Sequence, residues 1–487
     1  MLKLCGDYWD NVCRMDEALR VAKNFDVIKK RLFLGKEEIT LYYIDGFVDG
    51  GSMNKLMIYF LSLKGLGEPT DPTPDAAARF FCEHHLPYVE AEVTDNADAM
   101  LHAVLSGTSL ILGESFGSYA IVVDSRTYPT RSVGEPESDR VMMGSRDGFV
   151  ETLVFNTALI RRRVRDPALT MRYFCIGERS KSDVVLCYLE GQADPGYVRF
   201  LEKRLSQIQT AALPMGHESL AEKLIRDKWY NPFPKIRYTE RPDVAAAQVL
   251  EGSVLVVIDN SPEVMIFPAT IFDFMQETND FYFPPLTGSY IRLVRHLVFW
   301  ATLFLVPAWF FFTQNPEWTP TWLRFVLPTE TGKIPIFVQL LLVEFMIDGL
   351  RMASMTTPNM LSNSLSVVGG LILGDFAVGV GWLIPEVILY MAFVAIANFS
   401  QRSYQLGYAF KFLRIGLLIL IRLFGGIGFL FGGIGSIVLL ATNKTANGKR
   451  SYLYPLIPFD GKALYSMFFR MRKDKFPDTN GIRRSRR

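Results

Sequence analysis

Cysteine and histidine are scarce in this sequence of 487 residues. It has five of each, and the cysteines (Cys5, Cys13, Cys82, Cys175 and Cys187) form neither a metal-type pair nor a disulfide framework. This usage is typical of a protein kept in a reducing compartment. Cys82, His84 and His85 lie close together, but a cluster without a second ligand pair indicates ordinary packing. We therefore expect no metal site.

Motifs of the common enzyme classes are also absent. The sequence holds no Walker glycine loop, no G-x-S-x-G elbow, no H-E-x-x-H pair and no G-x-G-x-x-G after a strand. We therefore expect neither a catalytic site nor a cofactor. The net charge of +2 points to no polyanion, so nucleic acid is not an expected partner.

The first sixteen residues contain no apolar core of signal-peptide length. The polar half of the chain is therefore expected to stay on the side of the membrane where it is made. Charged residues make up 21% of the chain and hydrophobic residues 49%, and the charges crowd into residues 1–290 and the C-terminal tail. A soluble half is predicted to precede a membrane half.

Long apolar runs follow one another between Leu293 and Ala441. The run from Leu297 to Thr313 has no charge, lies behind Arg292 and Arg295, and with its flanks approaches the roughly 20 residues that a membrane-spanning helix needs. Several such runs in succession argue against the buried helix of a soluble enzyme. We expect four to six spans, with both chain ends cytoplasmic because basic residues flank the block.

The soluble half contains an internal repeat. Residues 39–49 (ITLYYIDGFVD) have a counterpart 145 residues later in residues 184–194 (VVLCYLEGQAD). The same offset relates six further residues of the first copy to identical ones in the second: Thr94, Asp98, Val104, Leu105, Gly107 and Leu110. Each copy is predicted to contain a strand closed by a glycine turn, two helices and a strand pair, which in the second copy covers residues 254–258 and 264–267. The fold class is therefore a tandem duplicated α/β domain followed by an α-helical polytopic membrane domain. One lobe should stack on the other, or the same lobe face should be used twice.

A distinctive stretch, residues 144–167, lies between the copies. Asp147 is predicted to cap a helix that ends before Asp166-Pro167. Four arginines gather near its C-terminal end: Arg161, Arg162, Arg163 and Arg165. Their positive charges interact favourably with the helix dipole at this end. They are also candidates for contact with a neighbouring subunit or with lipid phosphate. We place the first lobe at 1–132, a linking helix at 133–175, the second lobe at 176–290, the transmembrane domain at 291–443 and a basic cytoplasmic tail at 444–487.

Charged residues interrupt the membrane block. Glu344, Asp348 and Arg351 lie within about 60° of one another on one helix face, so they should face a partner helix or water. Two interpretations remain open: an Asp348–Arg351 salt bridge that locks helices together, or a polar wall of an ion path. Asp375, in the span expected at 365–384, would either attract cations or bond to the backbone or to Arg351.

Small residues in the block occur at the spacing that lets helices approach closely. They are Gly370 with Gly374, and Gly428 with Gly432. Pro385 precedes residues 387–399, which are short for a span and are expected to form a half-helix or a re-entrant piece.

Several motifs in order resemble the A-subunit family of bacterial spore germinant receptors. They are SRDGFVETLVFNTALIRRRVRDP at 145–167, GERSKSDV at 177–184, YNPFP at 230–234, TERPD at 239–243 and LEG at 250–252. Glu344, Asp348 and Arg351 also match an acidic-x3-acidic-x2-Arg pattern of that family. The likeness runs from about Ile39 into the tail, where YPLIPF at 454–459 is similar to a branch other than the receptor A subunits.

The resemblance implies a multi-pass protein of the spore inner membrane with both termini on the core side. Members of the family form homo-oligomeric, ion-conducting assemblies, so the resemblance implies monovalent cations, membrane lipid, a small membrane subunit and other germination proteins as partners. Glu344, Asp348 and Asp375 would line the ion path, with Arg351 as their charge partner. The alternative is a scaffold that conducts nothing and recruits a partner through its head. A secondary transporter would need an inverted membrane repeat, which we do not find.

Overall fold

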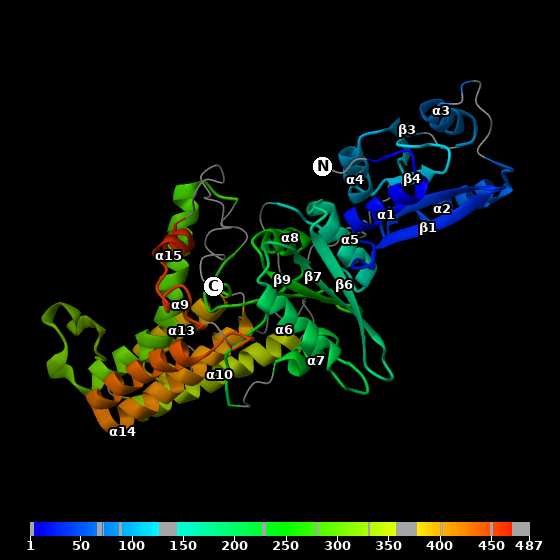
Figure 1. The fold of residues 1–487 in the computed structure, drawn as a ribbon. Coiled ribbons are helices and arrows are strands. Elements are labelled where there is room, and N and C mark those ends of the chain that lie inside the picture. Colours follow the sequence, from blue (N-terminus) through cyan, green and yellow to red (C-terminus); the bar gives the residue numbers. More distant parts are fainter. Residues whose placement is uncertain are drawn as a thin grey trace. The chain divides into compact units, whose positions relative to one another are not determined.

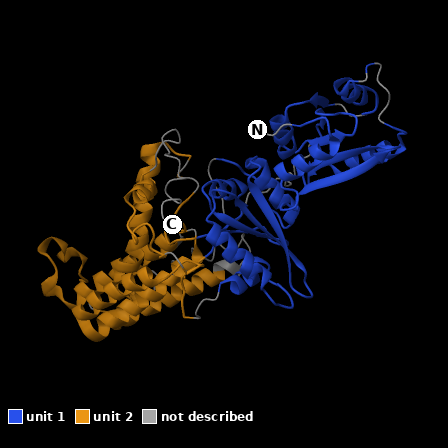
Figure 2. Cartoon of the chain, viewed as in Figure 1, with its two compact units in different colours: residues 1–227, 236–268, 476–487 blue, residues 228–235, 269–475 orange. Residues whose placement is uncertain are grey.

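The computed structural model describes residues 4–65, 71, 73–86, 90–125, 144–225, 230–277, 280, 282–329, 332–356, 377–399, 401, 403–448 and 451–469. The chain divides into two compact units (Figure 2). The first unit comprises the described residues within 4–225 and 236–268, and the second comprises those within 230–235 and 269–469. The basic end of the tail, from residue 470, lies outside the described residues.

The first lobe is a five-stranded antiparallel sheet with helices on both faces (Figure 1). Its strands, in the order β1-β2-β4-β5-β3, are β1 (Val27–Leu34), β2 (Glu37–Ile44), β3 (Ala91–Thr94), β4 (Ser109–Gly113) and β5 (Ala120–Val123). Helices α1 (Tyr8–Ala18) and α4 (Ala97–Leu105) pack on one face, and α2 (Gly50–Ser62) and α3 (Pro74–His84) pack on the other. Both sheet faces are therefore buried.

The second lobe repeats this topology in the order β6-β7-β9-β10-β8. Its strands are β6 (Leu169–Ile176), β7 (Ser182–Leu189), β8 (Arg237–Thr239), β9 (Val254–Ile258) and β10 (Val264–Phe267), and its helices are α5 (Leu153–Arg163), α6 (Pro195–Ser206), α7 (His217–Leu224) and α8 (Pro242–Leu250). β2 and β7, β4 and β9, and α4 and α8 each begin and end 145 residues apart. The strand pair expected at 254–258 and 264–267 forms β9 and β10.

The local sequence explains why the copies fold alike. Gly46 and Gly191 close β2 and β7 with φ of 79° and 84°, a left-handed conformation that favours glycine. Asp49 and Asp194 then cap α2 and α6, each accepting a backbone N–H of the first helical turn. The same turn and the same cap thus start the helix in each lobe.

Helix α5 is not a separate linker but the counterpart of α1, because both of its ends lie 145 residues after those of α1. Asn11 of α1 bonds the backbone of Cys5 and Gly117, and Asn156 of α5 bonds the backbone of Val150 and Ser261 in the same manner. The boundary expected between residues 175 and 176 falls inside β6. The second lobe therefore begins earlier in the chain, with α5.

The lobes meet along α5. Arg161 of α5 is fully buried and binds both carboxylate oxygens of Asp26, which lies directly before β1. A Cβ added at Gly46 would lie 2.9 Å from Val154 Cγ1, so the turn after β2 packs closely on the same helix. Asn24 Oδ1 accepts the backbone N–H of Met171 at 2.7 Å. One face of α5 thus serves its own lobe and another face holds the first lobe.

The second unit is helical. Its helices are α9 (Pro285–Gln314), α10 (Ile336–Thr356), α12 (Ala377–Gly379), α13 (Pro385–Phe399), α14 (Tyr404–Thr442) and α15 (Gly461–Phe468), with short 3-10 turns η2 (Pro316–Trp318) and η3 (Thr321–Val326) after α9. α9 packs against α13 and α14, and α10 packs against the same two helices. Most of the span expected at 365–384 lies outside the described residues.

Helix α14 turns back on itself at Gly425, which has φ of 58°. A Cβ at Gly428 would lie 2.0 Å from the carbonyl oxygen of Leu420, and one at Gly432 would lie 2.8 Å from a methyl carbon of Leu417. Residues eight and fifteen apart meet only if the segments 404–424 and 426–442 run side by side, as the two orange helices show (Figure 1).

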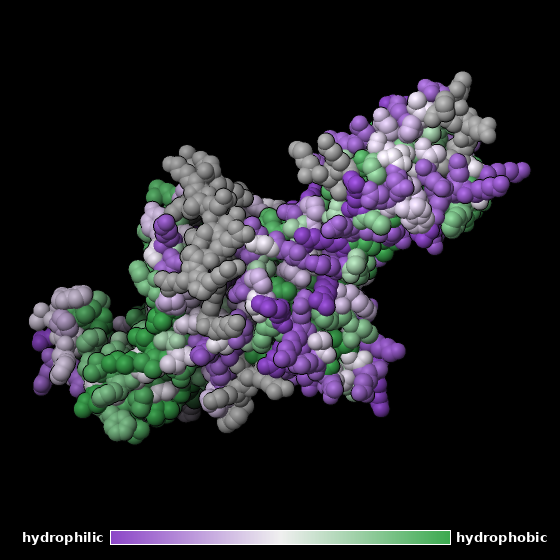
Figure 3. Space-filling view, in the orientation of Figure 1, coloured by the Kyte–Doolittle hydropathy of each residue, from purple (hydrophilic) through white to green (hydrophobic). Residues whose placement is uncertain are grey.

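Among the described residues, two helices are long and apolar enough to cross a membrane: α9, with 30 residues, and α14, whose 39 residues include the turn at Gly425. α13 has 15 residues, and the 21 residues of α10 include three charges. The described residues therefore do not confirm four to six spans. Apolar side chains gather on the surface of the helical unit (Figure 3), including Leu423, Phe424, Ile427, Leu430 and Phe431. Such a surface suits lipid contact better than water.

Candidate functional site

Four charged side chains meet inside the helical unit. Glu344 and Asp348 are four residues apart on α10, and Lys411 and Arg414 are three residues apart on the 404–424 segment of α14. These spacings place each pair on one face of its helix, so the acidic face of α10 meets the basic face of α14. We call these four residues the charge cluster.

The most buried pair of the cluster joins Glu344 and Arg414. Arg414 donates from Nε to Glu344 Oε1 at 2.7 Å, and its Nη2 lies 2.5 Å from the same oxygen. The Arg414 side chain has no exposed surface and that of Glu344 is 5% exposed. Arg414 also donates from Nη1 to the carbonyl oxygen of Thr302 on α9 at 2.7 Å. One guanidinium therefore connects α9, α10 and α14.

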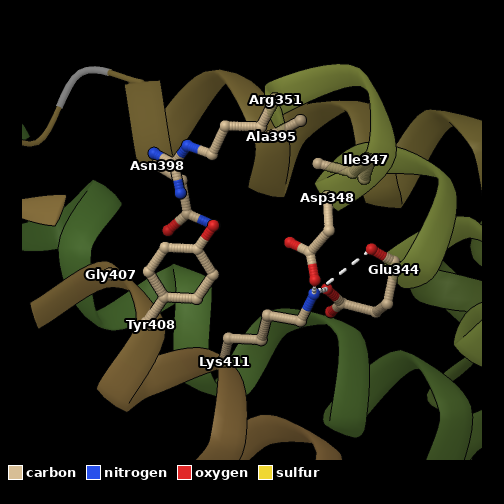
Figure 4. A pocket seen from close by; sticks show the side chains of 9 residues that line it. All are labelled: Glu344, Ile347, Asp348, Arg351, Ala395, Asn398, Gly407, Tyr408 and Lys411. Atoms are coloured by element: carbon tan, nitrogen blue, oxygen red, sulfur yellow. Dashed lines mark hydrogen bonds and ion pairs between the residues drawn. The ribbon is translucent and has the colours of Figure 1, made fainter. Parts of the chain in front are cut away.

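The second pair lies nearer the surface. The ammonium of Lys411 forms an ion pair with Asp348, lies 3.5 Å from Glu344 Oε2 and donates to the Glu344 carbonyl oxygen at 3.2 Å (Figure 4). Asp348 keeps 30% of its side chain exposed. The two carboxylates and two cations balance, so the cluster as a whole carries no net charge.

Arg351 lies beside the cluster. A bridge between Asp348 and Arg351 was one of the two interpretations left open, and the ion pair that the structure shows for Asp348 is with Lys411. The Arg351 guanidinium lies 4.9 Å from the ring centre of Tyr404 and 5.2 Å from that of Tyr408, within the range of cation–π attraction. It lines a small cavity with Asp348, Lys411, Asn398 and Tyr408 (Figure 4).

Because these charges are buried, their pairing matters for the stability of the helical unit. Moving an ion out of water costs roughly several kcal/mol of free energy unless a partner and further hydrogen bonds compensate. Within a bilayer this cost rises. Paired as they are, the four groups hold three helices together. If α10 and α14 separated, two carboxylates would become available to cations. The arrangement can therefore act as a lock, as a gate, or as both.

The other acidic candidate, Asp375, and the glycines Gly370 and Gly374 lie outside the described residues. Gly428 and Gly432 lie where the two segments of α14 approach each other. Among the described residues, no group of three or more histidine, cysteine or acidic side chains is placed to hold a metal. His84 instead stacks on Phe80, with ring centres 4.3 Å apart.

The arginines of α5 do not form one surface. Arg161 is buried against Asp26, which is at odds with a contact to lipid or to another subunit. Arg163 binds Asp147 and Ser145. Asp147 does not cap the helix as expected, because the helix begins at Leu153, directly after Thr152. Arg162 is exposed, and Arg165 donates to the carbonyl oxygen of Arg162. These two remain on the surface as candidates.

Lys411 and Arg414 are the site residues that the sequence reading leaves unassigned. Two cations three residues apart in the otherwise apolar run 406–421 are a signal of the same kind as Glu344 and Asp348. Two acidic residues on one apolar helix and two basic residues on another would have predicted that these helices pair. The sequence gives no register between α10 and α14, so the individual partners could not be read from it.

The comparisons with known proteins agree with one another. Residues 15–479 match the GerA family, described as "Bacillus/Clostridium GerA spore germination protein". The chain is 38% identical to Stage V sporulation protein AF of Bacillus subtilis over 92% of this chain and 90% of that protein. It is 28% identical to Spore germination protein KA of B. subtilis over 93% of this chain and 82% of that protein.

A solved structure is also similar. It is the N-terminal domain of the A subunit of the Bacillus megaterium spore germinant receptor GerK3, with 24% sequence identity and a TM-score of 0.41. The match covers 54% of this chain and 96% of the solved domain.

Proposed function

Because the chain belongs to the GerA family of spore germination proteins, we propose that it is a membrane subunit of a germination complex whose helical unit contributes to a gated ion path. The observation that supports this proposal best is the charge cluster. Charges inside apolar helices are costly, and where they occur they commonly serve transport or gating. We assign the protein to the spore inner membrane, where its family relatives are expected to act in germination.

The proposed gate is the contact between α10 and α14. In the proposed closed state Lys411 and Arg414 form ion pairs with Asp348 and Glu344, so these carboxylates are not available to other cations. A movement that separates the two helices would free both carboxylates. Asp375, on the segment that follows α10, remains part of the proposed path. Amplification of a signal that is sensed elsewhere is the role proposed for such a gate.

The proposed complex is a homo-oligomer with a small membrane subunit and other germination proteins. A path for monovalent cations needs a polar wall on several sides, and one cluster supplies one side. Copies of the chain around an axis would supply the rest. Arg162 of α5 and Arg165, which follows the end of α5, are the arginines that this proposal keeps for contact with a neighbouring subunit or with lipid.

Ion flux through liposomes tests the proposal. Full-length protein, alone and with any membrane subunit that co-purifies, is reconstituted and assayed for potassium and sodium flux. The test variant is Glu344→Gln/Asp375→Asn. The matched control is Glu317→Gln, which removes an exposed carboxylate from η2 and leaves the cluster intact. We expect flux from the wild type and the control, and loss of flux in the test variant at equal protein level.

The balanced charge of the cluster also favours a second candidate, a scaffold that conducts nothing. In that role the four residues only hold helices together, and a partner recruited through the α/β unit carries the ions. No flux from an intact oligomer in either preparation would favour the scaffold. Arg162→Ala/Arg165→Ala should then abolish complex formation, whereas Glu344→Gln should leave complex formation intact.

A further inference from the structure

Three large aromatic side chains are solvent-exposed in the segment after α9. Trp318, Trp322 and Phe325 are 73%, 73% and 80% exposed, on the two 3-10 turns η2 and η3. Leaving one such side chain in water forgoes about 1.5–3 kcal/mol of burial free energy. Three neighbours in this state indicate that something other than water covers them.

The segment that carries them is folded. The indole N–H of Trp309 donates to the carbonyl oxygen of Val326 at 2.8 Å, which fixes the end of η3 against α9. The rings of Phe311 and Trp318 pack edge to face with centres 6.2 Å apart, and Thr319 is buried. The aromatic side chains are therefore held outward by a fixed backbone.

A second loop presents a fourth aromatic side chain at the same end of the helical unit. Trp382 lies before α13 and is 52% exposed. Lys333, which precedes α10, donates from Nζ to the carbonyl oxygen of Val380 at 2.9 Å, and Thr329 donates from its backbone N–H to Glu386 at 3.2 Å. The loop after η3 and the loop before α13 thus lie together. We call the four side chains Trp318, Trp322, Phe325 and Trp382 the aromatic end.

The aromatic end lies where the apolar part of α9 stops. The apolar run of α9 ends at Thr313 and is followed by the polar residues Gln314 and Asn315. The stretch from Tyr290, itself 66% exposed, to Gln314 rises about 36 Å at 1.5 Å per residue. A bilayer has a hydrocarbon core of about 30 Å. Tyr290 and the aromatic end would then lie at opposite surfaces of one bilayer.

We propose that the aromatic end is embedded in the phospholipid headgroup region of the bilayer and fixes the depth of the helical unit. Indole rings combine an apolar body with an N–H donor, so they are enriched at this level of a membrane. The exposed charges Glu317 and Arg324 lie among the aromatic side chains. A headgroup layer accommodates apolar and charged groups side by side, whereas the core of a protein interface is depleted of charge. This inference does not depend on the proposed ion path.

Fluorescence quenching tests the proposal. The full chain is reconstituted in phosphatidylcholine/phosphatidylglycerol vesicles that contain lipid brominated either near the headgroup or near the chain end. Wild type is compared with Trp318→Phe/Trp322→Phe, so that the difference in emission reports these two indoles. Trp9→Phe is the matched control, because Trp9 is 49% exposed but belongs to the α/β unit. Iodide in the aqueous phase serves as the second quencher.

We expect lipid brominated near the headgroup to quench the emission of Trp318 and Trp322 more than lipid brominated near the chain end. The emission of Trp9 should respond to iodide and to neither lipid. Iodide quenching of Trp318 and Trp322 equal to that of Trp9 would place them in water. Resistance to all three quenchers would place them against protein. Either result overturns the proposal, and neither bears on whether the liposomes conduct ions.

Discussion

At the scale of single residues, Arg414 is a fully buried cation in the helical unit. Its side chain has no exposed surface, and its guanidinium reaches Glu344 on α10 and Thr302 on α9. Arg414→Met should destabilise the protein by about 3–5 kcal/mol, because it leaves the Glu344 carboxylate buried without its cation. Thermal unfolding of the full chain in lipid nanodiscs measures this loss.

The double variant Glu344→Gln/Arg414→Met separates charge from packing. It removes both charges, so it should recover most of the stability that the single variant loses. Arg422→Met provides the control, since Arg422 is an exposed arginine on the same segment of α14 and should change stability little. Equal losses in the single and double variants would show that Arg414 contributes mainly through packing.

His217 gives the α/β unit a dependence on pH. Its Nε2 lies 3.0 Å from Glu263 Oε2, and its Nδ1 lies 2.8 Å from Ser261 Oγ. Burial alone would lower the pKa of His217, but the hydrogen bond and charge of Glu263, with the charge of Glu218, raise that pKa above 6.5. The protonated ring therefore stabilises the fold.

Because the pKa is raised on folding, this contribution is fully present below pH 6.5 and is lost as the pH rises through the raised value. In the wild type the thermal unfolding midpoint should fall as the pH rises from 6.5 through the raised pKa of His217. His217→Gln should flatten the fall, whereas His102→Gln, at an exposed histidine on α4, should leave it unchanged. Unfolding monitored by circular dichroism over a pH series measures both. An unchanged slope in His217→Gln would refute the assignment.

At the scale of elements, the turn within α14 depends on glycine. A Cβ at Gly428 would lie 2.0 Å from a backbone oxygen, which cannot move without displacing residues 404–424. Gly428→Ala should therefore destabilise the protein by about 1–3 kcal/mol, despite the better helix propensity of alanine.

Gly435→Ala is the matched control for this substitution. Gly435 lies on the same segment and has nothing within 4 Å of an added Cβ. This variant should be neutral or slightly stabilising, by up to about 1 kcal/mol. The thermal midpoints of the two variants in detergent provide the comparison, and similar midpoints would mean that residues 426–442 do not pack on residues 404–424 as described.

Sequence patterns anticipated some elements and missed others for physical reasons. The offset of 145 gave β2 and β7 the same turn and the same cap, because Gly46, Asp49 and their counterparts are needed by the backbone itself. α5 was missed as the counterpart of α1 because the two helices share only Asn11 and Asn156. At their other positions the two helices differ, and α5 buries a second face against the first lobe.

The candidate site was anticipated in a similar, partial way. The cost of charge in an apolar helix identified Glu344, Asp348 and Arg351 from the sequence alone. Which cation each carboxylate meets depends on the register of α10 against α14, a tertiary property that no local pattern encodes. This is why the sequence left open whether Asp348 meets Arg351 and did not indicate the pair with Lys411.

At the scale of the whole molecule, the contact between Arg161 and Asp26 joins the two lobes. Both side chains are at most 2% exposed. Arg161→Met should cost about 3–5 kcal/mol and should loosen the first lobe from the second, because it strands a buried carboxylate. Limited proteolysis of the full chain, followed by mass spectrometry, should show faster cleavage near residues 19–26.

Two further variants decide whether charge is the cause of this loosening. Arg162→Met alters the neighbouring, exposed arginine and should leave the cleavage rate near that of wild type. Asp26→Leu/Arg161→Met removes both charges and should restore much of the protection. Faster cleavage in all three variants would point to helix α5 itself and not to the ion pair.

The Asp26–Arg161 ion pair also sets the order in which the two lobes complete their folding during synthesis. Asp26 and Arg161 are 135 residues apart, and synthesis proceeds at about 5–20 residues per second. For roughly 7–27 seconds at that rate, a growing chain therefore contains Asp26 but not the cation that neutralises it. All five strands of the first lobe leave the ribosome within that interval. We expect this lobe to fold with a hydrated edge and to close only when α5 arrives, so its completion is timed by its own duplicate.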